Sequence, residues 1–219
     1  MTDLAVHLAR SANLSASDRV YDMGFGCGDQ ISVFQQYGIQ SYTGQTCSRR
    51  QYQFAANNWA GKPNVKLILS CTSEPKIPRN TTKILALDSL YHINRSDFLR
   101  NAHACCAESC VVAFTDLLRT PTTSRMQNSL LKVIEIASGA TFAADLSFLS
   151  NSGWRVLVVE DLTDDVFLPL GNYLSTQSFK WRLFGRVVSW WSRSGTVRFL
   201  LVTAEKSTVD VTLNFGETN

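Results

Sequence analysis

A glycine-rich segment at residues 22–28 has the composition of a ligand-binding loop. It reads DMGFGCG, follows an apolar run at 19–21 and leads into a helical pattern that stops at Gly38. A strand, a glycine turn and a helix in this order let a ligand contact bare backbone at a helix N-terminus. The nicotinamide-dinucleotide fingerprint would require a third glycine where Asp29 stands, and a carboxylate at the end of the next strand. The segment therefore predicts a ligand loop and argues against a nicotinamide cofactor.

Three side chains near the ends of expected strands are candidates for moving a proton. His92 follows the fourth expected strand and is the best candidate for a general base, because imidazole titrates near neutral pH. The alternative is a histidine that hydrogen-bonds a carbonyl at a helix entrance. Tyr91 and Asp116 are lesser candidates, since Asp116 can equally cap the turn that follows it. His7 and His103 lie away from any motif and are interpreted as surface or packing residues.

An alternation of short apolar runs and amphipathic stretches must position these residues. The expected strands are at 19–23, 40–44, 65–69, 83–87, 111–115, 154–160 and 196–204. The expected helices are at 29–37, 48–59, 96–107, 122–137 and 141–151, with a poorly patterned stretch at 71–82. Strands that alternate with helices predict an α/β fold in which helices cover both faces of a parallel sheet. No repeat or linker divides the chain, so we expect a single domain over residues 1–219.

Two of these helices have recognisable ends. Ser96 is a candidate N-cap, because it precedes an apolar face that begins with Phe98 and Leu99. Gly153 is expected to end the helix at 141–151 in a left-handed conformation. Both signals place helix boundaries close to expected strands.

The composition argues against several classes of function. The net charge is only +3 and the basic residues are scattered, so nucleic acid is not an expected partner. The N-terminus lacks a basic start followed by a long apolar core, so no secretory signal is expected. No uncharged stretch approaches transmembrane length. We therefore expect a cytoplasmic protein.

Six cysteines fit that compartment, and none of them forms a paired Cys-x-x-Cys pattern. Cys27, Cys47 and Cys71 each follow one of the first three expected strands, whose ends converge on the ligand crevice of such a sheet. Three small side chains that line a tight pocket are favoured over a metal or redox site, because no histidine or carboxylate accompanies them at ligand spacing. No metal is expected.

Four segments resemble, in order, the motifs of class I S-adenosylmethionine-dependent methyltransferases. Residues 22–28 resemble motif I, and residues 44–51 resemble the Gly-x-Thr-x-Ser-x-x-Gln signature of the branch of sarcosine and phosphoethanolamine methyltransferases and cyclopropane synthases. Residues 86–92 and 113–116 resemble the ends of the fourth and fifth strands. The resemblance implies a Rossmann-like, seven-stranded, mostly parallel sheet with an antiparallel last strand. About twenty residues precede Asp22, which implies a shortened N-terminal lid.

The resemblance also implies S-adenosylmethionine as the cofactor and assigns residues to it. Thr46 and Gln51 match the side chains that bind the ribose hydroxyls in that branch, where most class I enzymes use a carboxylate. Asp22 is interpreted as a residue that orients the glycine loop. After the third strand, this chain has Cys71 and Thr72 near the position where many relatives have an acidic residue beside the adenine. The complete expected set is Asp22, Gly24, Gly26, Gly28, Gln30, Thr46, Gln51, Cys71, Thr72, Asp88 and Ser89.

A long segment between the last two strands, residues 163–194, bears on the second substrate. Helical spacing places an apolar stripe on it, formed by Trp181, Phe184, Val188 and Trp191. Basic residues flank the stripe, namely Lys180, Arg182, Arg186 and Arg193. Such a helix could lie on a membrane surface. We favour the alternative that it covers the sheet and forms a wall of the substrate pocket, because most amphipathic helices bury their apolar stripe in the protein.

The sequence predicts a methyltransferase that acts on a small hydrophobic or aromatic metabolite. The cofactor-binding half is expected at about 1–116 and the substrate-side elements at about 117–194. One alternative is a protein that binds the cofactor without methylating, as a partner subunit or a catalyst of another reaction. Another is a lipid-directed enzyme such as a cyclopropane synthase. A homodimer formed through the tryptophan stripe is a further possibility.

Overall fold

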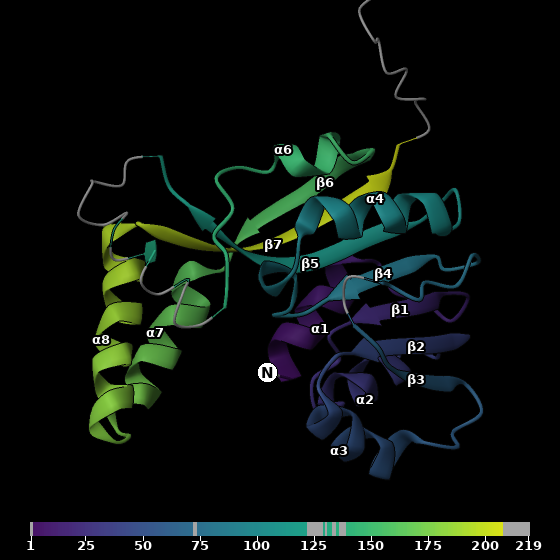
Figure 1. Ribbon diagram of the computed structural model, residues 1–219, viewed down its shortest axis with the longest axis horizontal. Helices are drawn as coiled ribbons and strands as arrows, with labels where there is room; N and C mark the ends of the chain where they lie inside the picture. Colours follow the sequence, from purple (N-terminus) through teal and green to yellow (C-terminus); the bar gives the residue numbers. More distant parts are fainter. Residues whose placement is uncertain are drawn as a thin grey trace, which may run out of the picture.

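Seven strands form one sheet in the order β3-β2-β1-β4-β5-β7-β6 (Figure 1). The computed structural model describes residues 2–71, 74–121, 129, 131–132, 135 and 139–207. The strands are β1 (Arg19–Met23), β2 (Ser41–Thr46), β3 (Val65–Leu69), β4 (Lys83–Ala86), β5 (Val111–Arg119), β6 (Trp154–Asp161) and β7 (Val197–Lys206). Strands β1 to β5 pair in parallel, whereas β7 is antiparallel to both β5 and β6. The expected seven-stranded sheet with an antiparallel last strand is confirmed.

The register of the sheet brings the ends of the central strands together. Asp22 on β1 pairs with Gly44 on β2 and with Leu85 on β4. Leu85 in turn pairs with Ala113 on β5. The loops that follow these strands therefore leave the same edge of the sheet, as the crevice of an open parallel sheet requires.

Side chains that alternate along the strands pack into two hydrophobic cores, one on each face of the sheet. On β1, Val20 packs on one face, whereas Tyr21 and Met23 pack on the other. The first face is covered by α1 (Thr2–Ser11), α2 (Asp29–Gln35) and α3 (Arg49–Trp59). The second face is covered by α4 (Arg95–Cys105) and α6 (Ser147–Ser150). Helices on both faces are thus confirmed.

Helix α1 joins the N-terminal part of the chain to the last two strands. Its Leu8 is fully buried in the first core. Nε2 of His7 lies 2.8 Å from a carboxylate oxygen of Glu160 on β6. The hydroxyls of Ser11 and Thr203, on β7, are 2.5 Å apart. His7 and Ser11 therefore link α1 to the last two strands, although the His7 side chain stays partly exposed.

Two expectations about helices are wrong. The helix expected at 141–151 is confined to Ser147–Ser150, because the preceding backbone bonds to other segments. The N–H of Thr141 donates to Tyr91 O, and the N–H of Ala143 donates to Leu117 O, both at 2.8 Å. The N-cap of α4 is Asn94 rather than Ser96, since the Asn94 side chain accepts a hydrogen bond from the N–H of Asp97. The helix expected at 122–137 lies mostly outside the described residues.

The segment between β6 and β7 forms two helices, α7 (Thr163–Ser175) and α8 (Phe179–Ser194). They pack against each other as a hairpin that projects away from the sheet (Figure 1). Of the expected apolar stripe, Val188 and Trp191 are buried, whereas Trp181 is 54% exposed. Among the described residues, no helix combines the length and apolar character needed to cross a membrane.

Candidate functional site

A cavity of about 260 Å³ lies beside the glycine loop. Helix α1 contributes Ala5 to its wall, and Leu87 closes it from the end of β4. Its lining contains five residues of the expected cofactor set, namely Gly24, Gly26, Gln30, Gln51 and Asp88. Residues from the segments that follow β1, β2 and β4 therefore converge on one cavity, as the sheet topology requires.

The three glycines of the loop have different roles. All have positive φ angles: 81° at Gly24, 58° at Gly26 and 89° at Gly28. A Cβ atom on Gly24 would lie 2.5 Å from Cβ of Ser89, and one on Gly28 would lie 2.9 Å from Cβ of Ala55. A Cβ on Gly26 would meet no atom within 4 Å. Gly24 and Gly28 thus allow close packing, whereas Gly26 presents bare backbone to the cavity.

Asp22 forms the buried base of the loop. Its Oδ2 accepts hydrogen bonds from the hydroxyl of Tyr42 at 2.6 Å and from Nε2 of Gln30 at 2.8 Å. Its Oδ1 is buried without a hydrogen-bond partner among the described residues. Burial raises the pKa of Asp22 to about 6, although the bonds from Tyr42 and Gln30 act in the opposite direction. Oδ1 therefore retains an unused position for accepting a hydrogen bond.

The raised pKa makes Asp22 a source of pH-dependent stability. The folded state binds the Asp22 proton more tightly than the unfolded state, so this stabilisation is present below about pH 4 and is lost as the pH rises through about 6. We expect Asp22→Asn to remove this loss of stability at rising pH, because the asparagine side chain does not titrate. Its free energy of unfolding relative to the parent should rise by about 2–3 kcal/mol between pH 4 and 7. Urea unfolding over this pH range measures the difference.

Asp29→Asn is the control for this experiment, because it replaces a nearby exposed carboxyl, at the first residue of α2. Its unfolding free energy should run parallel to that of the parent. An Asp22→Asn profile that also runs parallel would contradict the assignment of a buried, proton-binding Asp22.

Thr46 and Gln51 lie together at the start of α3. The hydroxyl of Thr46 donates to Oε1 of Gln51 at 3.1 Å and accepts from the N–H of Ser48 at 3.2 Å. Ser48 caps the helix by accepting from the N–H of Gln51. The cap therefore holds the expected ribose-binding pair in one orientation, with Gln51 at the cavity wall.

Gln45 was not recognised in the sequence, although it organises the wall beyond β3. Its Oε1 accepts from the hydroxyl of Tyr21 at 2.9 Å and from the N–H of Lys76 at 2.8 Å. Its Nε2 donates to the carbonyls of Cys71 at 2.8 Å and Glu74 at 3.2 Å. The sequence carries no signal that singles it out, because β2 reads SYTGQT and Gln45 is one of several polar residues in it; its full burial is visible only in the structure.

Asp88 and Ser89 fix the end of β4 to its neighbours. The N–H of Asp88 donates to the hydroxyl of Thr115 at 2.8 Å, and that hydroxyl donates to Oδ1 of Asp88 at 3.1 Å. Burial raises the pKa of Asp88. The hydroxyl of Ser89 donates to the carbonyl of Met23. Ser89 thus packs directly beneath Gly24, and Asp88 faces the cavity.

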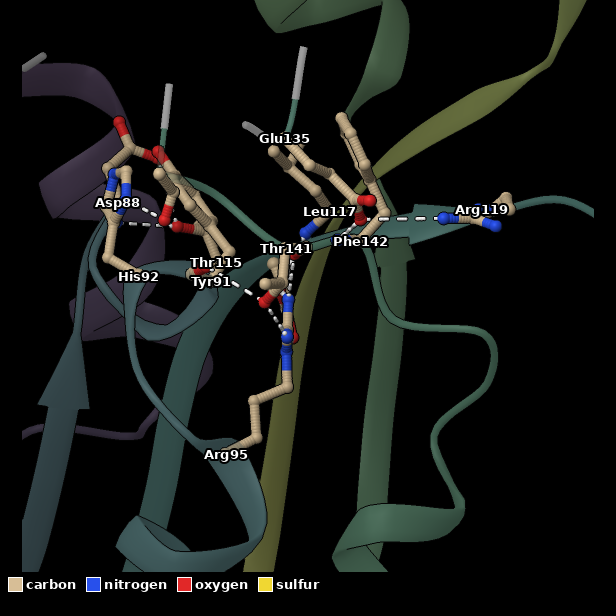
Figure 2. A network of polar contacts seen from close by, with 12 residues as sticks. Asp88, Tyr91, His92, Arg95, Thr115, Leu117, Arg119, Glu135, Thr141 and Phe142 are labelled. Carbon is tan, nitrogen blue, oxygen red and sulfur yellow. Dashed lines mark hydrogen bonds and ion pairs between the residues drawn. The ribbon is translucent and has the colours of Figure 1, made fainter. Parts of the chain in front are cut away.

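Two of the three proton-transfer candidates, His92 and Tyr91, lie beside Asp88 (Figure 2). They belong to a 3₁₀ turn, η1 (Leu90–His92), and their ring centroids are 4.6 Å apart. His92 is exposed, and its Nδ1 lies 3.3 Å from the carbonyl oxygen of Gly139. Burial, together with the charge of Asp88, raises the pKa of the half-buried Tyr91. His92 borders a second, open hollow of about 640 Å³ and is not part of the smaller cavity's lining.

Asp116, the third candidate, is engaged by Arg95. Its two oxygens accept from Nε and Nη2 of Arg95, each at 2.6 Å, and Oδ1 also accepts from the N–H of Leu117. Burial raises the pKa of Asp116, and the Arg95 guanidinium opposes that shift. Arg95 also donates to the hydroxyl and carbonyl of Thr141, as Figure 2 shows. Asp116 therefore positions Arg95 and the segment at 141, a role that the sequence did not indicate.

The cysteines after the first three strands are all exposed. Cys27 lines the cavity, and Cys71 follows β3. Thr72 lies outside the described residues. In the part of the chain that the structure describes, no three His, Cys, Asp or Glu side chains group as metal ligands do. His103 packs edge-on against Trp154, with ring centroids 5.9 Å apart.

No protein-family model and no curated protein matches this sequence. Solved structures do match. A geranyl diphosphate C-methyltransferase from Streptomyces coelicolor A3(2), in complex with Mg²⁺, geranyl diphosphate and S-adenosylhomocysteine, superposes with a TM-score of 0.79 at 15% identity, over 94% of this chain and 77% of that one. A putative sarcosine dimethylglycine methyltransferase from Galdieria sulphuraria gives a TM-score of 0.76 at 15% identity, over 94% and 85%.

The chain has the class I methyltransferase fold. The fold that the motifs implied is thereby confirmed. The [4+2]-cyclase SpnF shares the methyltransferase fold with this chain, with a TM-score of 0.70 at 17% identity over 94% of this chain and 81% of SpnF. Because these identities are low, the comparisons bear on the architecture, and the chemistry must be argued from the site.

Proposed function

We propose that this protein binds S-adenosylmethionine in the cavity beside the glycine loop and transfers its methyl group to a small hydrophobic or aromatic metabolite. The observation that carries the proposal is the convergence of Gly26, Gln51 and Asp88 on one cavity. These residues come from three segments that resemble methyltransferase motifs. Two further features fit the cofactor: bare backbone at Gly26, and the unpartnered buried Oδ1 of Asp22, which suits its ammonium group.

The remaining expected residues take their roles from the same motifs. Thr46 and Gln51 would bind the ribose hydroxyls, and the segment at Cys71 and Thr72 would border the adenine. The glycine loop, Gln30, Asp88 and Ser89 would shape the part of the cavity next to the reacting group. Residues 1–116 would thus hold the cofactor, and residues 117–194 would supply the acceptor side.

The chain's own residues then align and deprotonate the acceptor. The cofactor supplies an electrophilic methyl group on a sulfonium, so the protein mainly holds the acceptor in line and excludes water. His92 is the proposed base, because it is exposed beside the Asp88 loop and can take a proton from an acceptor in the open hollow. Tyr91 would orient it by ring contact, and the Asp116–Arg95 pair would hold the segment at 141 that borders the hollow.

Calorimetry with S-adenosylhomocysteine and with NAD tests the cofactor. We expect the first to bind and NAD not to bind. Combining Thr46→Val with Gln51→Leu should weaken S-adenosylhomocysteine about tenfold or more, since each lost hydrogen bond contributes about 1 kcal/mol. Gln53→Leu is the matched control, because Gln53 is an exposed glutamine on the same helix. Binding of NAD without a response to S-adenosylhomocysteine would end the proposal.

Incubation with S-adenosylmethionine and a metabolite extract tests methyl transfer. Products heavier by one methyl group are expected, and His92→Gln should slow their formation without changing cofactor affinity. The second candidate function is a catalyst that binds the cofactor but performs another reaction. It is favoured by the shared fold of the [4+2]-cyclase SpnF. Cofactor binding without any methylated product would support it.

A further inference from the structure

The hairpin of α7 and α8 is a closely packed projection whose base is buried against the rest of the protein (Figure 1). A Cβ on Gly185 would lie 2.9 Å from Cβ of Leu174, and one on Gly171 would collide with Ser189 Oγ, so the two helices touch through bare backbone. At the base, Trp191 is 4% exposed and packs against Phe142 and Phe167, with ring centroids 5.7 Å away in both cases. The two helices are therefore packed closely against each other, and the base of the hairpin is buried.

The far end of the hairpin exposes large apolar side chains. Tyr173 is 63% exposed, Phe179 73%, Trp181 54% and Leu183 56%. These four residues, which we call the hairpin tip, surround the turn between the two helices. Single exposed apolar residues are ordinary on a protein surface, but a group of aromatic residues on one projection indicates an interaction site.

The charge around the tip has one sign. Between Asp165 and Glu205 the chain contains no carboxylate side chain, whereas it contains Lys180, Arg182 and Arg186. All three are exposed, and none forms an ion pair within the part of the chain that the structure describes. The hairpin tip is therefore aromatic and flanked only by cations.

We propose that the hairpin tip binds the surface of an anionic lipid bilayer. Tryptophan, tyrosine and phenylalanine favour the boundary between headgroups and acyl chains, and lysine and arginine beside them are attracted to lipid phosphates. A contact between the tips of two copies would instead bring like charges together, which disfavours that pairing. The inference is independent of the proposed methyl transfer, since it rests only on the hairpin.

Vesicle flotation of the full chain, without cofactor, tests this proposal. We expect binding to vesicles of phosphatidylcholine mixed with phosphatidylserine, weaker binding to phosphatidylcholine alone, and weakening by salt. Two double variants should each reduce the partition coefficient about tenfold or more: Phe179→Ser with Trp181→Ser, and Lys180→Gln with Arg182→Gln. The control combines Phe54→Ser with Arg79→Gln, an exposed aromatic residue and an exposed cation away from the hairpin.

The measurements separate lipid binding from the alternatives. Circular dichroism and S-adenosylhomocysteine binding should be unchanged in all three double variants, which shows that a loss of flotation is not unfolding. A parent that binds neither vesicle would overturn the proposal, and so would hairpin variants that float as the parent does. Sedimentation velocity covers the remaining case: if the variants lose only self-association, the tip is an interface between copies and the lipid assignment is wrong.

Discussion

Gly26→Val should weaken cofactor binding on the order of 100-fold with only a modest loss of stability. Gly26 faces the cavity, and a Cβ there would meet no protein atom within 4 Å, so the valine side chain would occupy ligand space rather than clash with the core. Overpacking of about 3 kcal/mol would weaken binding on the order of 100-fold. Its φ of 58° also strains a branched residue, at about 1–3 kcal/mol. Calorimetry with S-adenosylhomocysteine and urea unfolding measure the two effects.

Gly61→Val is a matched control. Gly61 also has a positive φ, of 81°, and a Cβ there would also meet nothing within 4 Å, but it lies after α3 and not in the cavity lining. Both variants should lose similar stability, because both force valine into the same backbone region. Only Gly26→Val should lose binding. Equal affinity of the two variants for S-adenosylhomocysteine would mean that the cofactor binds elsewhere.

Arg95→Met should cost about 3–5 kcal/mol of stability, because it leaves a buried carboxylate without its partner. The side chains of the Arg95–Asp116 pair are only 10% and 1% exposed. The substitution also removes the two hydrogen bonds to Thr141, so the segment bordering the open hollow should loosen. Urea unfolding gives the free energy, and hydrogen exchange of the Thr141 amide reports the local loosening.

Arg100→Met on the same helix provides the comparison. Arg100 pairs with Asp97, but these side chains are 57% and 58% exposed, and such pairs contribute about 0–1 kcal/mol. A loss in Arg95→Met as small as that in Arg100→Met would show that the buried pair does not hold this region. Adding Asp116→Leu to Arg95→Met should recover part of the lost stability, since no unpaired charge remains.

Local sequence patterns were sufficient to predict most of the strands in the sheet. The run at 19–23 is both an expected strand and β1, because its alternating side chains feed two cores. The helix expected at 141–151 failed for a non-local reason: Tyr91 and Leu117, far away in the chain, accept its backbone hydrogen bonds. The N-cap of α4 is Asn94, whereas the sequence predicted Ser96. Asparagine and serine can both cap a helix, so the position at which the chain turns into α4 decides between them.

The glycine loop and the Thr46–Gln51 pair could be singled out in the sequence, since both motifs are short and local. The polar groups that brace the segments around the cavity and the open hollow were not visible in the same way. Gln45 acts through carbonyls at residues 71 and 74, and Arg95 reaches Asp116 across 21 positions of sequence. Such partners depend on strand order and register, which a single sequence specifies only through the complete fold.

The position of β7 has a consequence for how this chain folds. Among the described residues it is the strand furthest along the chain, yet it lies between β5 and β6 and also carries Thr203, a partner of α1. Until it emerges, β5 and β6 both present open edges, and loop closure between residues 111–119 and 197–205 comes late. Unpaired strand edges in incomplete sheets promote aggregation. We therefore expect a chain in which β7 has not yet inserted to aggregate more readily than the complete sheet.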